Sequence, residues 1–76
     1  MEIKDFIEVF ADCFDDTEAS EIKADTSFRD LDEWSSLVGM SVIAMAKLSY
    51  NATITGTELK TCNTVQDVFN LIVSKQ

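Results

Sequence analysis

The stretch from residue 37 to residue 48 constrains the fold of this 76-residue chain more than any other. Its side chains are apolar except at Gly39, Ser41 and Lys47, and it is shorter than the ~20 residues that a membrane span needs. An ordinary surface helix shows one apolar stripe, whereas this segment is apolar around most of its circumference. We therefore predict a central helix that begins at Ser35 or Ser36 and ends near Ser49. So short a chain cannot enclose it on every side, and some of its apolar residues should face solvent or a partner.

The segments before and after it have the periodicity of amphipathic helices. Apolar residues at helical spacing predict a first helix over residues 2–14. A second apolar stripe follows Thr64, which with Asp67 forms a short capping box, and a helical turn is expected at residues 57–61. The two stripes consist of Ile3, Phe6, Ile7, Phe10 and Phe14, and of Val65, Val68, Phe69 and Ile72. The fold class is thus all-α, a small four-helix bundle of three main helices and one short helix, in one domain spanning residues 1–76.

A long connection joins the first two main helices. Residues 15–35 are rich in Asp, Ser and Thr, which favour turns and helix caps, and Ile22, Phe28 and Leu31 are their apolar anchors. We expect one helical turn near residues 18–22. A loop this long in so small a domain is often functional.

Composition narrows the classes of function. The net charge is −8, and residues 1–36 hold 12 acidic and 3 basic residues, so basic protein surfaces are better partners than nucleic acids. The chain has no histidine, and its two cysteines, Cys13 and Cys62, lack the spacing of a zinc site. We expect a cytoplasmic, monomeric protein that is not an enzyme, with no metal site and no membrane span.

The sharpest local feature is the serine pair at the predicted start of the central helix. A phosphate on such a serine would meet unpaired backbone amides and the positive end of the helix dipole. The alternative is that the serines only cap the helix. The residues by themselves leave both interpretations open.

The sequence around this pair resembles the acyl and peptidyl carrier proteins. Their attachment motif, Asp-Ser-Leu at the start of the second helix, corresponds here to Ser35-Ser36-Leu37, and Trp34 precedes it as in some free-standing carriers. The resemblance covers essentially the whole chain in register. Its further elements are Asp25-Thr26-Ser27-Phe28, Asp30-Leu31, Ile54 and Thr64-Val65-Gln66-Asp67.

The resemblance implies a carrier function. A phosphopantetheinyl transferase would move a 4'-phosphopantetheine arm from coenzyme A onto Ser36, and the arm's thiol would hold an acyl group as a thioester. Acyl-loading and acyl-processing enzymes (a ligase, a ketosynthase or an acyltransferase) would be the partners, in fatty-acid, polyketide or related biosynthesis. Our hypothesis is that partners dock on apolar and acidic residues around the serine: Asp30, Asp32, Glu33, Trp34, Leu37, Val38, Met40 and Met45.

Departures from the family pattern favour a specialised carrier over the housekeeping fatty-acid carrier. Ser35 occupies the family's Asp position, Asp32-Glu33-Trp34 stands where the family has a glycine, and the central helix lacks the family's acidic residues. Other candidates are an aminoacyl or peptidyl carrier and an acidic helical interaction module without an arm. An EF-hand calcium loop fails at its sixth and twelfth positions. A catalytic role for Ser36 has no histidine to support it, and Lys47 lies ~16 Å along the helix.

Overall fold

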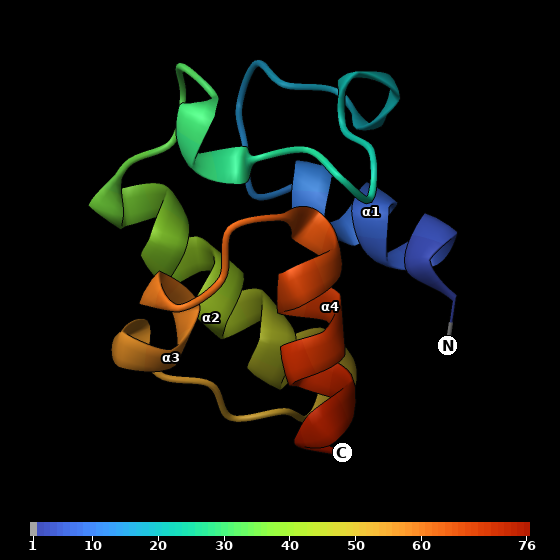
Figure 1. The fold of residues 1–76 in the computed structure, drawn as a ribbon, viewed down its shortest axis with the longest axis vertical. Coiled ribbons are helices and arrows are strands. Elements are labelled where there is room, and N and C mark those ends of the chain that lie inside the picture. The colour runs from blue at the N-terminus through green and yellow to red at the C-terminus, as the bar shows by residue number, and fades with distance from the viewer. Residues whose placement is uncertain (1) are drawn as a thin grey trace.

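The computed structural model describes residues 2–76, and its regular elements are helices (Figure 1). Four α-helices and two 3₁₀ turns follow one another along the chain, and the described residues contain no β-strand beyond an isolated bridge between Ser27 and Thr64. The elements are α1 (Ile3–Ala11), η1 (Ala19–Glu21), η2 (Phe28–Asp30), α2 (Ser36–Tyr50), α3 (Gly56–Lys60) and α4 (Val65–Ser74). The predicted all-α class, with three longer helices and one short one, is confirmed.

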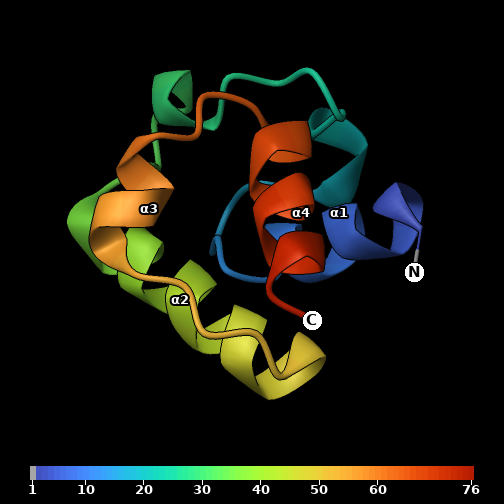
Figure 2. The same ribbon diagram turned by 60° about the horizontal axis from the view of Figure 1, so that its bottom comes forward.

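Helix α4 packs beside α1, and α3 packs beside α2 (Figure 2). Helix α1 contacts both α4 and α2, and α2 contacts α3. The long connection between α1 and α2 crosses one end of the bundle, with η1 and η2 on it (Figure 1). Within residues 2–76 no helix is long and apolar enough to cross a membrane.

Aromatic rings form a continuous path through the core. Phe6 and Phe10 of α1 are fully buried, and the ring of Phe6 lies 5.5 Å from that of Phe69 on α4. The path continues from Phe10 to Phe28 at 5.9 Å between centroids, and from Phe28 to Trp34 at 4.7 Å in an edge-to-face arrangement. Aromatic pairs of this geometry add to the stabilisation that burial provides. The residue two positions before Ser36 is therefore anchored to the centre of the bundle.

The helix starts follow the predicted capping residues. The Ser35 hydroxyl accepts from the Val38 amide at 3.3 Å, and the Thr64 hydroxyl accepts from the Asp67 amide at 3.2 Å in a complete capping box. The similar box in which Thr55 begins α3 with Glu58 was not predicted. Each cap satisfies a backbone amide that has no acceptor within the helix.

The first helix is shorter than predicted. It ends at Ala11 rather than at residue 14, and the chain continues in a tighter turn in which the amides of Cys13 and Phe14 donate to the carbonyls of Phe10 and Ala11. Acidic residues follow at once, and negative charge is unfavourable at the negative end of a helix dipole. The tight turn still delivers Phe14 to the core, where 6% of it is exposed.

The long connection is held to α4 by backbone hydrogen bonds. The Val65 amide donates to the Thr26 carbonyl at 3.1 Å, and the Gln66 amide donates to the Ala24 carbonyl at 2.8 Å. Ile22 and Phe28 are buried as predicted, and Leu31 is half-buried. The predicted turn at residues 18–22 is confirmed as η1, whereas η2 was not predicted. The segment that leads to Ser36 is thus ordered by its anchors.

Candidate functional site

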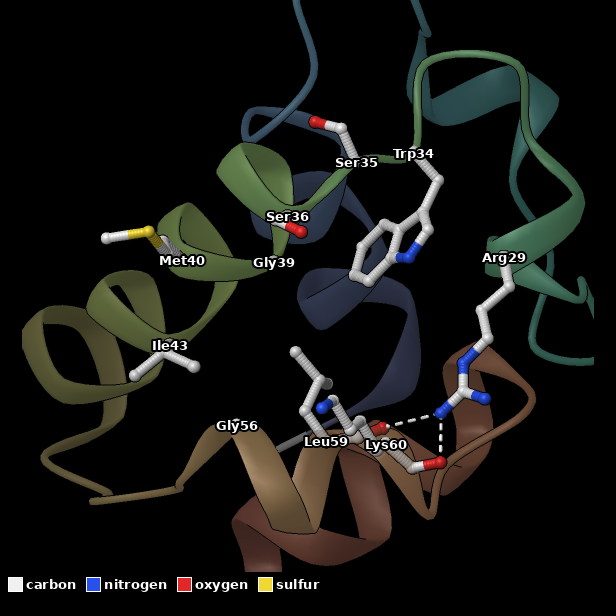
Figure 3. Close-up of a pocket in the computed structure, with 10 residues that line it drawn as sticks. All are labelled: Arg29, Trp34, Ser35, Ser36, Gly39, Met40, Ile43, Gly56, Leu59 and Lys60. Atoms are coloured by element: carbon white, nitrogen blue, oxygen red, sulfur yellow. Dashed lines mark hydrogen bonds between the residues drawn. The ribbon is translucent and has the colours of Figure 1, made fainter.

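Ser36 is the first residue of α2 and is exposed. Ser35 supplies the cap, because its hydroxyl accepts from the Val38 amide and its carbonyl accepts from the Gly39 amide at 2.9 Å. No hydrogen bond within residues 2–76 engages the Ser36 hydroxyl, which points in a different direction from the Ser35 hydroxyl (Figure 3). The two serines therefore have separate roles: Ser35 begins the helix, and Ser36 presents a hydroxyl that the fold does not use.

A groove of about 220 Å³ opens beside Ser36, between α2 and α3 (Figure 3). Its walls are mainly apolar: the indole of Trp34 faces Leu59 of α3, and Ile43 of α2 lies further along. Met40 also borders the groove, but its side chain points away from it. The serine hydroxyl thus stands at the rim of an apolar recess.

A small residue stands at the point where α2 meets the walls of the groove. Gly39 is buried, and a Cβ atom there would lie 3.6 Å from the Trp34 ring and 3.7 Å from a methyl group of Leu59. These are ordinary van der Waals distances, so the glycine leaves a shallow space without being sterically required. The proximity of Trp34, Gly39 and Leu59 was not predicted, because these residues are up to 25 positions apart in the chain.

Arg29 closes one edge of the groove by binding the end of α3. A terminal nitrogen of its guanidinium donates to the Leu59 carbonyl at 3.1 Å and also to the Lys60 carbonyl. The last carbonyls of a helix lack partners within the helix, and a cation near them is favourable. Arg29 thereby ties the long connection to α3 and fixes the distance between the groove walls.

Glu33, predicted as a docking residue, is engaged within the protein. Its carboxylate accepts from the amides of Asp15 and Asp16 at 2.9 and 2.8 Å and from the Thr17 hydroxyl at 2.7 Å. These hydrogen bonds lower the pKa of Glu33 below its ordinary value, and the bond from the Thr17 hydroxyl has a larger effect than those from the two amides. Glu33 therefore holds the turn after α1 against the segment that precedes Ser36, and its oxygens are already occupied.

The other predicted docking residues divide into an exposed and a buried group. Asp30 and Asp32 are exposed, and Leu37 and Met40 are 73% and 66% exposed. Trp34 and Val38 are half-buried against the core. Met45 is only 7% exposed and belongs to the core, so its assignment to the docking surface is wrong. A helix that is apolar on all sides does not reveal from its sequence which face turns inward.

The exposed face of α2 extends further than the predicted set. Leu48 is 86% exposed, and Ala44, also exposed, lies between it and the first turn of the helix. Leu37, Met40, Ala44 and Leu48 are separated by three, four and four positions, which places them on one face. We call these four residues the α2 stripe. The spacing of these four residues is visible in the sequence and could have identified the stripe. Nothing in the sequence indicates that Arg29 and Lys60 lie together, because only the fold brings residue 29 to α3.

Both cysteines are poor nucleophiles. Cys62 is buried and Cys13 is half-buried, and neither forms a disulfide. Burial, and then the neighbouring Asp12 carboxylate, raises the pKa of the Cys13 thiol from 9.0 to about 11. Residues 2–76 contain no group of three or more acidic or cysteine side chains placed to hold a metal ion.

Comparisons of the chain with protein-family models, with curated proteins and with solved structures found no match. Functional inference therefore depends on the site itself.

Proposed function

We propose that this protein is an acyl carrier that holds its cargo as a thioester on a 4'-phosphopantetheine arm attached to Ser36. The observation that carries the proposal is the exposed hydroxyl of Ser36, which begins a 15-residue helix and makes no hydrogen bond within the described chain. The adjacent groove and the α2 stripe give this hydroxyl an apolar setting in which an arm and its partners could be accommodated.

The start of α2 is suited to the phosphodiester that such an attachment creates. The first amides of a helix have no acceptor within it, and Ser35 uses only the Val38 amide. The amides of Ser36 and Leu37 therefore remain for a phosphate oxygen, with the positive end of the helix dipole behind them. A modification at this position would add to the stability of α2 rather than disturb it.

The attachment reaction is a phosphoryl transfer catalysed by a partner. The Ser36 oxygen would bond to the β-phosphorus of coenzyme A, the bond between the two phosphates would break, and adenosine 3',5'-bisphosphate would leave. A base of the phosphopantetheinyl transferase would take the hydroxyl proton, since the chain has no histidine to do so. The carrier contributes position and recognition, and we expect no catalytic activity of its own.

Partner enzymes would bind two neighbouring surfaces of the carrier. Asp30 and Asp32 are exposed just before the serine, and the α2 stripe begins just after it. This combination favours partners with an apolar contact face that has basic residues at one end. We expect these partners to be the transferase and acyl-loading and acyl-processing enzymes such as a ligase, a ketosynthase or an acyltransferase, in the cytoplasm. The site equally accommodates an aminoacyl or peptidyl cargo.

A second candidate is a helical interaction module without an arm. The exposure of Leu48, at the end of α2 remote from Ser36, favours it because an arm-bearing serine would not require apolar contacts so far away. This alternative predicts partner binding that is unaffected by loss of the serine.

Intact-mass measurement distinguishes the two candidates. Purified protein is incubated with coenzyme A and a promiscuous phosphopantetheinyl transferase, beside the variants Ser36→Ala and Ser35→Ala. We expect one phosphopantetheine on wild type and on Ser35→Ala, and none on Ser36→Ala. Protein shown to be folded that several transferases leave unmodified would refute the carrier proposal and favour the interaction module.

A further inference from the structure

We propose that the groove between α2 and α3 binds a compact apolar group that bears a carboxylate, and that the cargo is accordingly a short acid with an anionic end. The statement about the cargo rests on the carrier function proposed above. The statement about the groove does not, and it can be tested on protein that lacks the arm.

The size of the groove favours a small ligand. Its volume of about 220 Å³ is below the ~300 Å³ at which sites for drug-sized ligands begin, and it exceeds the ~150 Å³ of an engineered cavity that holds benzene. Trp34, Ile43 and Leu59 provide an apolar surface for one ring or a short branched chain. A long acyl chain would extend beyond these walls.

The charges around the groove differ in sign from those of the protein as a whole. The net charge is −8 and the chain has only six basic residues, yet two of them, Arg29 and Lys60, line this groove and no acidic residue does. The one salt bridge within residues 2–76 joins Lys75 to Glu58, so neither groove cation is neutralised by a carboxylate of the described chain. Such a site attracts an anion.

Solvent-facing hydrogen-bond donors at the groove favour a carboxylate. Arg29 is exposed, and one terminal nitrogen of its guanidinium binds the two carbonyls of α3, so the remaining N–H groups face solvent, where a ligand oxygen can replace water. The indole N–H of Trp34 makes no hydrogen bond in residues 2–76 and is open to solvent, since no buried side-chain nitrogen there lacks a partner; it lies on the side of the ring that faces Arg29 (Figure 3). A carboxylate accepts several hydrogen bonds, and those from a cation are the stronger ones. A neutral chain would contact the apolar wall and leave these donors to water.

The test uses the Ser36→Ala protein, which cannot carry an arm at that position. Two-dimensional ¹H–¹⁵N NMR follows the indole N–H resonance of Trp34, which is unambiguous because the chain has one tryptophan. The probes are phenylacetate, the neutral 2-phenylethanol of similar shape, and acetate, which has no apolar body. We expect a saturable shift with phenylacetate, at least ~tenfold weaker binding of 2-phenylethanol, and no saturable shift with acetate.

Two matched variants separate the groove cation from general charge. Lys60→Gln should weaken phenylacetate binding about fivefold to tenfold, because it removes one groove cation whose side chain makes no hydrogen bond in residues 2–76. Lys47→Gln removes the same charge from an exposed position of α2 that does not line the groove, and it should leave binding unchanged. Arg29 is not varied because it also holds α3 in place.

Equal binding of the acid and the alcohol, an equal effect of the two lysine variants, or no saturable shift of the Trp34 resonance would each overturn the proposal. The result is independent of the transferase assay. Phenylacetate binding in a chain that no transferase modifies would refute the carrier function and leave the groove assignment intact. Normal modification of wild type without phenylacetate binding would refute the groove assignment alone.

Discussion

Replacing Gly39 by alanine should stabilise the protein. Gly39 lies inside α2, and no described glycine has a positive φ angle, so alanine can adopt its backbone conformation. The added Cβ would meet the Trp34 ring at 3.6 and 3.8 Å and Leu59 at 3.7 Å, which are contact distances without overlap. The gain is therefore the helix-propensity difference between glycine and alanine, about 1 kcal/mol in the free energy of unfolding. For a domain of this size that gain raises Tm by about 4–8 °C.

Thermal unfolding followed by far-UV circular dichroism measures this shift, with urea unfolding as a second measurement. Gly56→Ala is the matched control. Gly56 is the first residue of the short helix α3, where the interior propensity difference does not apply in full, and a Cβ there meets nothing within 4 Å, so its effect should stay within ~0.5 kcal/mol. A Gly39→Ala protein with an unchanged or lower Tm would contradict the geometry. It would mean that Trp34 and Leu59 pack more closely on α2 than described, with no space for a groove.

Three further outcomes follow from individual contacts. Thr64→Ala removes the cap of α4 and should lower the free energy of unfolding by about 1 kcal/mol. Its control is Thr53→Ala, at an exposed loop position, which should change the free energy of unfolding by less than ~0.5 kcal/mol. Urea unfolding of both variants measures the two changes. The pKa of Glu33 is lower in the folded than in the unfolded chain, so its contribution to stability is complete above pH ~4.5 and is lost as the pH falls through the folded-state pKa. Glu33→Gln should consequently reduce the dependence of Tm on pH in the range from roughly pH 5 to roughly pH 3. An unchanged dependence of Tm on pH would refute the role of this carboxylate as the acceptor of three hydrogen bonds. Alkylation of Cys13 at pH 8 should be about 100-fold slower in folded than in urea-unfolded protein, since its pKa is raised from 9.0 to about 11; equal rates in peptide-resolved mass spectra would contradict this.

Most of the helices could be predicted because apolar spacing and capping residues, which involve only neighbours in sequence, indicated the same helices. Phe6 and Phe10 fall on one face of α1, and both are fully buried. Thr64 and Asp67 identify the start of α4 because a capping box involves only neighbours in sequence. The end of α1 was placed three residues too late because Phe14 continues the apolar spacing, although its burial is achieved by a turn rather than by a helix.

The site was predictable only in part. The position of Ser36 at the start of α2 followed from the serine pair and the apolar run after it. The engagement of Glu33 and the binding of Arg29 to α3 could not be predicted, because each joins segments at least 16 residues apart and depends on how the long connection packs. Met45 was misassigned because the apolar residues of α2 surround the helix, and only its neighbours decide which side is enclosed.

Locating the modification tests the proposed carrier function at the residue that would bear the arm. Wild-type protein incubated with coenzyme A and a phosphopantetheinyl transferase is digested, and the peptide that contains Ser35 and Ser36 is sequenced by tandem mass spectrometry. We expect phosphopantetheine on Ser36 alone, since the Ser35 hydroxyl caps α2 and the Ser36 hydroxyl makes no hydrogen bond in residues 2–76. Modification of Ser35, modification at another residue, or an unmodified peptide from folded protein would contradict it.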